Sequence, residues 1–362
     1  MTRPVKPLKS SAAAVTTSAL HCWIKKYWRW LLGLLGLLLA WHALKGVAWT
    51  SVWDLLTRIS PLAILIIVAI NLLMLPLMTA RWWLLLRTLG EPVGLLPMCA
   101  YRLAANTISY LTPGPHFGGE PLSVYLLYHR DGISLSSATT SVTIDRLLEL
   151  LASILVLTLC LVSLTFVEST PLQRSQGLFF TIIFFALFAF TLAALFTGRR
   201  PLSRALLLLI KLCRRSFPSL LRTTSLTGII VEGETKAETL FRHNGRRFLL
   251  ANLFSLVHWF GIFAEFWLLS LFLGFPLSFT QLTALVVVAR LAFFTPLPAG
   301  IGVLETALPW ITAALGLGSD LGLSLCLIIR FRDLLFSFAG LGLTLNYLTC
   351  QRKAVIINAE NS

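Results

Sequence analysis

Long apolar runs dominate the sequence, and short polar or Gly/Pro-rich segments separate them. A helix needs about 20 mainly apolar residues to cross the hydrocarbon core of a bilayer. Apolar windows of about this length or longer occupy residues 28–46, 60–79, 93–111, 138–167, 177–197, 248–273, 277–297 and 321–348. The pattern predicts an all-α polytopic membrane protein with about eight spans.

The composition agrees with this prediction and excludes several classes of protein. Hydrophobic residues make up 57% of the 362 residues and charged residues only 12%, whereas a soluble domain has about 25% charged residues. This deficit excludes a cytosolic enzyme, a disordered chain and an ordinary nucleic-acid-binding protein. The six cysteines are scattered, and the sequence has no Cys/His cluster, P-loop or dinucleotide-binding motif. We therefore expect neither a metal nor a cofactor.

Basic residues give the expected orientation. The net charge is +15, and two polar segments hold 17 of the 30 Lys and Arg residues, six between Arg3 and Arg29 and eleven between Arg199 and Arg247. Because cytoplasmic loops are enriched in Lys and Arg, we expect a cytoplasmic arm over 1–26, a cytoplasmic loop over 198–247 and a cytoplasmic tail over 349–362. The start of the loop is either a basic helix in the headgroup layer or a solvated segment.

The apolar windows alone do not give a number of crossings that keeps the arm, the loop and the tail all on the cytoplasmic side. The window at 60–79 is expected to end on the inside, at Arg81 and Arg87. The window at 93–111 then runs outward, so the chain must return to the inside within 113–132. In the second half, 248–273 runs outward and 277–297 inward, so the chain must return to the outside within 298–320. Neither segment contains an uninterrupted apolar span. Broken or re-entrant helices are the expected solution, provided that protein or water surrounds their backbone.

The two return segments share a motif. Each has a Thr-Pro-x-Pro turn, nearby glycines and a glutamate, followed 26 or 25 residues later by an arginine with an acid three positions on. The first set is Pro113, Gly114, Gly118, Gly119, Glu120, Arg146 and Glu149, and the second is Pro296, Pro298, Gly300, Gly302, Glu305, Arg330 and Asp333. Residues i and i+3 share a helix face, so each arginine is expected to pair with the acid that follows it.

The span count gives these segments opposite orientations, which predicts two inverted-topology repeats at about 93–167 and 277–348. Interrupted helices in matching positions of inverted halves mark the central site of many transporters. Ionisable residues inside spans cost roughly 2.5–3.5 kcal/mol each, so they normally face a cavity or a partner. Beyond the repeat residues they are Arg102, Asp145, Glu265, Arg290 and Arg332. Every cation among them is Arg, which binds phosphate bidentately.

Structural explanations stay open beside the functional ones. The Arg-acid pairs either bind substrate or are structural ion pairs, and the Pro/Gly clusters are either helix breaks or ordinary turns. Glu120 and Glu305 follow the breaks directly, so each either caps a new half-helix or couples to a proton or substrate. His258 and Glu265, two turns apart on one helix face, are either a proton relay or structural groups.

The motifs within 106–149 and 298–333 resemble the transmembrane flippase-like domain of lysylphosphatidylglycerol synthases, with weaker similarity over about residues 27–348. In that family the first motif typically contains Asn, then Pro-Gly, then Gly-Gly-Glu, and the second motif is Pro-Gly-Gly-x-Gly-x-x-Glu. The positions that match are Asn106, Pro113, Gly114, Gly118, Gly119, Glu120, Pro298, Gly300, Gly302 and Glu305. Two positions depart from the pattern, since Ala299 replaces a glycine and Asp145 replaces a glutamate.

The resemblance implies a polytopic helical domain that translocates lipids across the cytoplasmic (inner) membrane. The soluble aminoacyl-transferase domain of the large family members is not expected here, so a transporter is favoured over an enzyme. We expect an anionic phospholipid or a polyprenyl-phosphate lipid as partner and no nucleic acid. The alternative is an integral-membrane glycosyl- or aminoacyl-lipid enzyme, or its accessory subunit.

In this hypothesis each candidate residue has a role in moving the lipid headgroup. Arg146 and Arg330 engage the phosphate, and Glu149 and Asp333 hold the two guanidinium groups in position. Glu120 and Glu305, at the broken helices, exchange partners as the cavity switches sides.

Overall fold

The computed structural model describes residues 49–112, 118–165, 245–295 and 297–360, together with isolated positions within 34–45 and 179–186. These residues form helices and turns, and none of them forms a strand, so the expectation of a helical protein is confirmed. The arm at 1–26, most of the expected spans 28–46 and 177–197, the loop up to residue 244, and Pro113, Gly114 and Pro296 lie outside the described residues.

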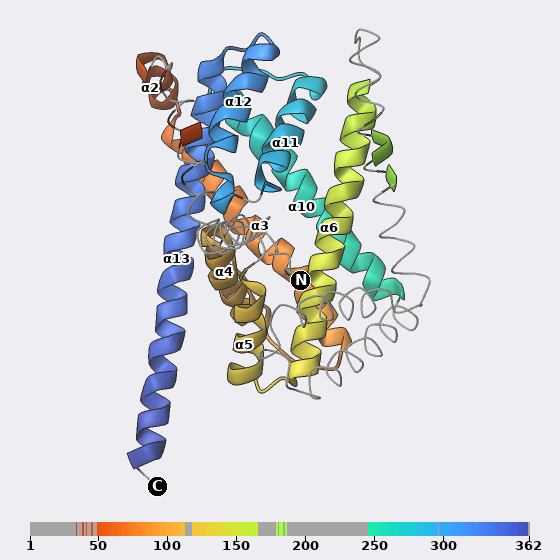
Figure 1. Cartoon of the computed structure of the whole chain (residues 1–362), viewed down its shortest axis with the longest axis vertical. Helices are drawn as coiled ribbons and strands as arrows, with labels where there is room; N and C mark the ends of the chain where they lie inside the picture. The colour runs from red at the N-terminus through yellow and green to blue at the C-terminus, as the bar shows by residue number, and fades with distance from the viewer. Residues whose placement is uncertain are drawn as a thin grey trace, which may run out of the picture.

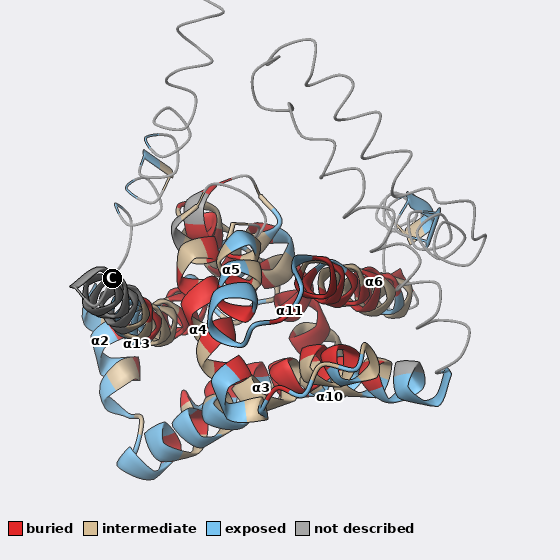
Figure 2. Cartoon of the chain, turned by 90° about the horizontal axis from the view of Figure 1, so that it is seen from below, coloured by how far each residue is buried: buried red, intermediate tan, exposed pale blue. Residues whose placement is uncertain are grey.

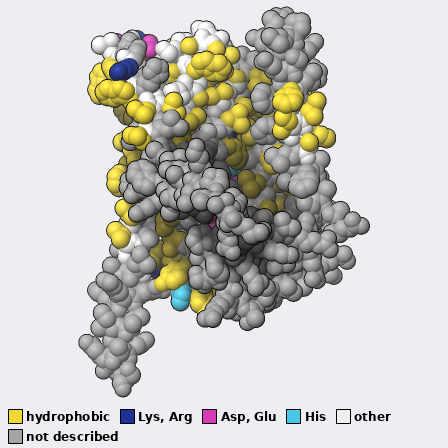
Figure 3. Space-filling view, viewed as in Figure 1, with side chains coloured by type: hydrophobic (Ala, Val, Ile, Leu, Met, Phe, Trp, Pro, Cys, Tyr) yellow, Lys and Arg dark blue, Asp and Glu magenta, His cyan; other side chains and the backbone are white. Residues whose placement is uncertain are grey.

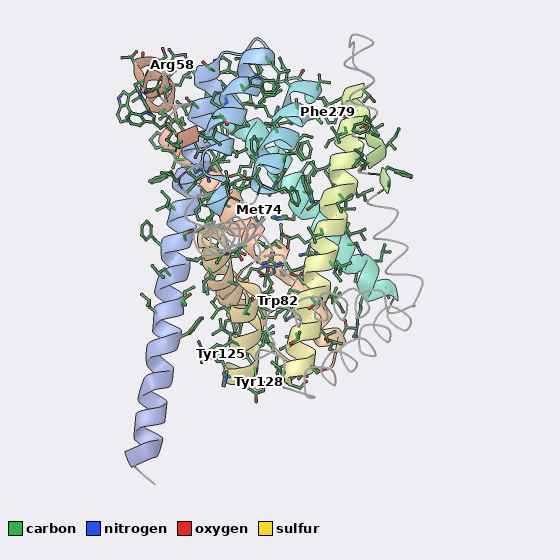
Figure 4. All side chains as sticks on the ribbon, viewed as in Figure 1. Arg58, Met74, Trp82, Tyr125, Tyr128 and Phe279 are labelled. Carbon is green, nitrogen blue, oxygen red and sulfur yellow. The ribbon has the colours of Figure 1, made fainter. Side chains whose placement is uncertain are left out.

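Three helices in the described part are long and apolar enough to cross a membrane, namely α3 (Pro61–Thr88), α6 (Leu135–Thr165) and α10 (Gly245–Phe272). The short helix α2 (Trp49–Thr57) precedes α3, and α13 (Ser319–Glu360) is 42 residues long. Figure 1 shows α3 and α13 running from the upper to the lower end, and α6 and α10 running the opposite way. In Figure 4, Arg58 lies just before α3, and Met74 and Trp82 mark the downward course of that helix.

Polar caps begin these helices where the apolar runs start. The Ser60 hydroxyl accepts a hydrogen bond from the N–H of Ala63 at 3.2 Å, and Pro61 lies in the first turn, where a missing N–H leaves no bond unmade. The Ser134 hydroxyl accepts in the same way from the N–H of Ser137 at 3.1 Å, at the start of α6. Local polar residues thus mark where α3 and α6 begin.

Two pairs of shorter helices form hairpins. The first pair is α4 (Leu95–Leu111) and α5 (Glu120–Arg130), and the second is α11 (Phe279–Phe293) and α12 (Val303–Ala314), joined through the 3₁₀ turn η1 (Pro298–Gly300). Their 11 to 17 residues correspond to about 16–25 Å of helix, less than the ~30 Å hydrocarbon core. The windows 93–111 and 277–297, predicted as full spans, therefore form the first arms of these hairpins.

The two hairpins enter the bundle from opposite ends. In Figure 1 the α4–α5 hairpin occupies the lower half and the α11–α12 hairpin the upper half, and α4 contacts η1 between them. Seen from below, α3 and α10 lie on one side of the bundle, and α13, α4, α11 and α6 lie on the other (Figure 2). The hairpin tips and both sides of the bundle therefore converge on its centre.

Buried apolar side chains among the described residues form two large clusters and one small one. Trp82, Met98, Tyr101, Leu127 and Val142 belong to the cluster of α3, α4, α5 and α6. Leu269, Leu285, Leu304, Leu321 and Leu325 belong to the cluster that α10 to α13 build together with residues of α2, α3 and α6. Figure 3 shows that hydrophobic side chains also predominate over the described outer surface on that face. Such a surface suits lipid, whereas the charged side chains of Arg81, Arg102 and Asp145 are buried.

Candidate functional site

A cavity of about 290 Å³ lies between α3, α4, α6, α10, α11 and α13. Its polar lining consists of Asn71, Asn106, Thr107, Tyr110, Arg146, Glu149, Ser153, His258, Glu265, Arg290, Arg332, Asp333 and Ser337. Met74, at mid-height in Figure 4, is one of the apolar lining residues. Of the site residues expected from the sequence, the cavity is lined by Asn106, Arg146, Glu149 and Asp333, whereas Glu120, Asp145, Glu305 and Arg330 do not line it.

One carboxylate holds two buried arginines from different helices. Asp145 of α6 is fully buried, and its two oxygens accept hydrogen bonds from Arg81 of α3 at 2.7 Å and Arg102 of α4 at 2.6 Å. Arg81 also donates to the Ser255 hydroxyl of α10 at 3.0 Å. Four helices are therefore tied together by charge-assisted hydrogen bonds, which are stronger than neutral ones.

Glu149 extends this network to the cavity wall. Its Oε2 accepts from Arg81 at 3.2 Å and from Arg146 at 2.9 Å, so the expected i,i+3 pair of Arg146 and Glu149 is present. The Glu149 side chain is 34% exposed, whereas that of Asp145 is 1% exposed. Arg146 and Glu149 are thus the members of this network that a molecule in the cavity can contact.

Glu120 and Glu305 make the same backbone contact at the two helix breaks. The Gly118 N–H donates to Glu120 Oε2 at 2.7 Å, just before α5. The Gly302 N–H donates to Glu305 Oε2 at 2.7 Å, at the start of α12. An acid in the first turn of a helix also suits the positive end of the helix dipole. The capping role that the sequence left open is therefore present in both halves.

Each of these glutamates also meets the arginine of its own half. Glu120 Oε1 lies 2.9 Å from Arg146 Nε, and Glu305 Oε1 accepts from Arg330 Nε at 2.7 Å. The Arg330 guanidinium further donates to the Tyr110 hydroxyl of α4 at 3.1 Å. This last bond joins the tip of the first hairpin to the second half of the protein.

Arg330 does not pair with Asp333, so the i,i+3 expectation was wrong for the second half. The remaining Arg330 donors are taken by the backbone carbonyls of Ala299 at 2.7 Å and Gly300 at 3.1 Å. The hairpin tip folds back onto α13 and offers these oxygens together with Glu305, which leaves no donor for Asp333. Asp333 instead accepts from Arg332 at 2.8 Å and 3.0 Å.

Arg332 and Glu265 form a separate charged group on the cavity wall. Arg332 donates to Glu265 Oε1, which also accepts from the amide of Asn71 at 3.0 Å. Arg332 is thus shared between Glu265 of α10 and Asp333 of its own helix. His258 makes no hydrogen bond to Glu265 within the described residues, so the geometry does not support a direct relay between them.

Small residues allow the hairpin tips to pack closely. A Cβ on Gly119 would overlap the carbonyl of Ala105, and a Cβ on Gly118 would overlap the Thr112 side chain. In the second tip Gly300 and Gly302 have φ of 61° and 88°, a region that favours glycine. Ala299 adopts φ 53° at the position where the sequence departs from the family's glycine. The helix is therefore interrupted at both predicted breaks. At the second break, Pro298 begins the 3₁₀ turn between α11 and α12.

The role of Arg81 was not predicted from the sequence. It was expected at the inner end of a span, yet α3 continues to Thr88 and Arg81 is only 4% exposed. The signal was its context, since Trp82-Trp83-Leu84 continues the apolar run directly after it. A cation flanked by apolar residues on both sides is more consistent with a buried partner than with a loop.

The charges around the centre balance in number. The cations are Arg81, Arg102, Arg146, Arg290, Arg330 and Arg332, and the anions are Glu120, Asp145, Glu149, Glu265, Glu305 and Asp333. Such a formally neutral but strongly polar centre, inside apolar helices and beside interrupted ones, is typical of membrane proteins that handle a polar or charged cargo.

These features define a helical membrane protein with a polar cavity at its centre. The chain belongs to the family described as the lysylphosphatidylglycerol synthase TM region, whose model matches residues 29–340. A UPF0104 membrane protein of Methanothermobacter thermautotrophicus is 32% identical over 96 residues, which cover 26% of this chain and 28% of that relative. The chain therefore matches little more than a quarter of that relative's length. No solved structure matches the chain. The family membership expected from the motifs is thereby confirmed.

Proposed function

We propose that this protein is a lipid translocase that moves the headgroup of a phospholipid, or of a polyprenyl or glycolipid, across the cytoplasmic membrane. The observation that carries the proposal is the cavity, where ionised side chains from several helices meet inside an otherwise apolar bundle. Charges at this depth are costly unless they serve a partner or a path. A volume of about 290 Å³ suits a headgroup, while the acyl tails stay in the surrounding lipid.

Two inverted repeats would let the cavity open to either side in turn. The Glu120–Arg146 and Glu305–Arg330 pairs repeat the same arrangement, a capping glutamate at a hairpin tip held by an arginine of the next long helix. One hairpin lies in the lower half and the other in the upper half (Figure 1). In transporters with this organisation, one repeat rocks against the other around a fixed site.

During such a motion the ion pairs would exchange partners without leaving charges bare. Arg146 is bound by Glu120 and Glu149 together, so a phosphate oxygen can replace one carboxylate while the other stays. Tyr110 and Arg330 link the two hairpin tips, and their hydrogen bond would break as the tips separate.

We further propose that the lower end in Figure 1 faces the cytoplasm, with both termini on that side. The end of α3, the end of α5 and the start of α10 lie there, and they carry Arg87, Arg130, Arg246 and Arg247. Cations next to spans favour the cytoplasmic side.

The test is a scrambling assay in phosphatidylcholine vesicles that contain a trace of fluorescent phosphatidylglycerol, phosphatidylethanolamine or polyprenyl phosphate. The reconstituted protein should speed the exposure of at least one probe to an external reductant, and Arg146→Gln should slow it. Arg58→Gln, at an exposed position beside α3, should behave as the wild type. Rates equal to those of protein-free vesicles for every probe would refute the proposal. A new lipid product in the mass spectrum would favour the enzyme alternative.

A further inference from the structure

Arg290 is the cavity arginine whose guanidinium has no acidic partner. Among the described residues, each other central arginine lies within 4 Å of a carboxylate, whereas Arg290 makes neither an ion pair nor a hydrogen bond. It comes from the last turn of α11 and lines the cavity. Its guanidinium carbon lies 5.2 Å from the centre of the Trp259 ring of α10.

A difference between the two halves of the protein leaves Arg290 without this partner. In the first half, the residue before Arg146 is Asp145, which holds two arginines. In the second half, the residue before Arg330 is Ile329, a buried apolar side chain. The second half therefore lacks the carboxylate that neutralises buried arginines in the first.

Two acids of the cavity wall, Glu265 and Asp333, already accept hydrogen bonds from other residues. Glu265 accepts from Arg332 and Asn71, and Asp333 accepts twice from Arg332. An unpaired guanidinium in a low-dielectric site is costly, so it gains strongly from a bound anion.

His258 supplies a second polar group without a partner in the same cavity. Its Nδ1 is buried, and within the described residues it has no hydrogen-bond partner. His258 precedes Trp259 on α10, so the imidazole and the guanidinium come from adjacent, contacting helices. A guanidinium and an imidazole that both lack hydrogen-bond partners among the described residues suit an oxyanion better than they suit a cation or an apolar group.

We propose that Arg290, assisted by His258, binds the phosphate group of the amphiphile that enters the cavity. This assignment rests on the proposed function for the cavity being a headgroup site, and it adds that the cargo must carry a phosphate. The Trp259 ring lies within cation–π distance of the guanidinium, and this contact leaves the N–H donors free for phosphate oxygens. Arg146 and Arg330, whose donors are taken by carboxylates and carbonyls, are then not the first groups to bind the phosphate.

Binding can be tested without transport, from the melting temperature of the purified protein in dodecyl maltoside. Four ligands are titrated: dioleoylphosphatidylglycerol, dioleoylglycerol, glycerol 3-phosphate and inorganic phosphate. A ligand that binds the folded state raises the melting temperature. The phosphatidylglycerol should raise it for the wild type, and the dioleoylglycerol, which lacks the phosphate, should not.

Arg290→Gln should weaken the apparent phosphatidylglycerol affinity about 10- to 100-fold, the loss expected for a charge-assisted hydrogen bond. Arg87→Gln is the matched control, because Arg87 also lies over a tryptophan, at 4.3 Å from the Trp83 ring, but does not line the cavity. It should bind as the wild type does. If Arg290→Gln does not fold, His258→Gln gives the second test, with an expected loss of about 5- to 10-fold.

The results separate this inference from the proposed function. Unchanged phosphatidylglycerol binding in a folded Arg290→Gln would overturn the inference even if the wild type scrambles lipid. Lost binding in that variant would support it even if no scrambling is found. A response to inorganic phosphate as large as that to the lipid would assign the site to free phosphate and overturn the lipid assignment.

Discussion

Asp145 is a single carboxylate that neutralises two buried arginines, and this makes it sensitive to substitution. Asp145→Asn keeps the size but removes the charge. Glu149 is then the one carboxylate that Arg81 and Arg102 share. Breaking a buried ion pair in this way costs about 3–5 kcal/mol. We expect a much lower melting temperature in detergent. Asp54→Asn, at an exposed position in α2, should change it little, and an equal loss in both variants would contradict this role for Asp145.

Ala299 offers a substitution in the opposite direction. Its φ of 53° costs an L-residue about 1–2 kcal/mol, a cost that glycine does not bear. Ala299→Gly should therefore raise stability by about 0.5–1 kcal/mol, measured by the same thermal unfolding. The matched control is Ala69→Gly, an exposed position inside α3, which should lower stability by about 1 kcal/mol. A loss of stability in both variants would mean that the Ala299 backbone is not strained.

The two Arg-acid pairs show which side-chain contacts can be predicted from the sequence and which cannot. The Arg146–Glu149 pair followed from helical spacing alone, because both partners are on one helix. The same spacing failed for Arg330, because Glu305 and two backbone carbonyls reach it from another element. A guanidinium has five donors, and which acceptors approach it depends on tertiary packing that local spacing does not contain.

At the scale of elements, the hairpin tips were predictable and the helix lengths were not. Pro, Gly and an acid in sequence mark a helix stop and a new start, and α5 and α12 begin where those residues predict. Hydropathy alone does not distinguish a full span from a half-length helix, since α4 and α11 both lie within apolar windows of about 20 residues. The hairpins are recognised only from the structure, where α5 runs back along α4 and α12 runs back along α11.

Close approach at the first tip gives a test at this scale. Gly119 has φ −88°, which alanine tolerates, so Gly119→Ala tests contact alone. The added methyl would overlap the Ala105 carbonyl of α4 and push α5 away, at a cost of about 1–3 kcal/mol. Gly245→Ala, at the start of α10 where nothing lies within 4 Å, should not lower stability. Melting temperatures measure both, and a neutral Gly119→Ala would show that α4 and α5 separate without cost.

At the scale of the whole molecule, the opposite entry of the two hairpins determines how the site can work. Ser134 lies at the turn between α5 and α6, and Ser319 begins α13 after α12. Figure 1 has these two turns at opposite ends of the bundle. If the bundle spans the membrane as proposed, they face opposite sides.

Cysteine labelling tests this prediction in intact cells. Ser134→Cys and Ser319→Cys are near-isosteric changes at exposed positions. A membrane-impermeant maleimide should label Ser319→Cys from outside and reach Ser134→Cys only after the membrane is opened. Cys99, Cys160 and Cys326 are buried and can remain, while Cys22, Cys213 and Cys350 are replaced by serine to keep the background low.

The two labelling sites together distinguish topology from simple misorientation. If both variants are labelled from the same side, the hairpins enter from one face, and the inverted-repeat basis of alternating access is lost. If the two sides are simply exchanged, the repeats stay inverted and only the assignment of the cytoplasmic end is wrong. The control is Arg58→Cys, which lies at the same end as the start of α11 in Figure 4 and should follow Ser319→Cys in either case. Because Arg58 precedes α3 and Ser319 follows α12, their shared accessibility requires an even number of membrane crossings between them, as the proposed topology has.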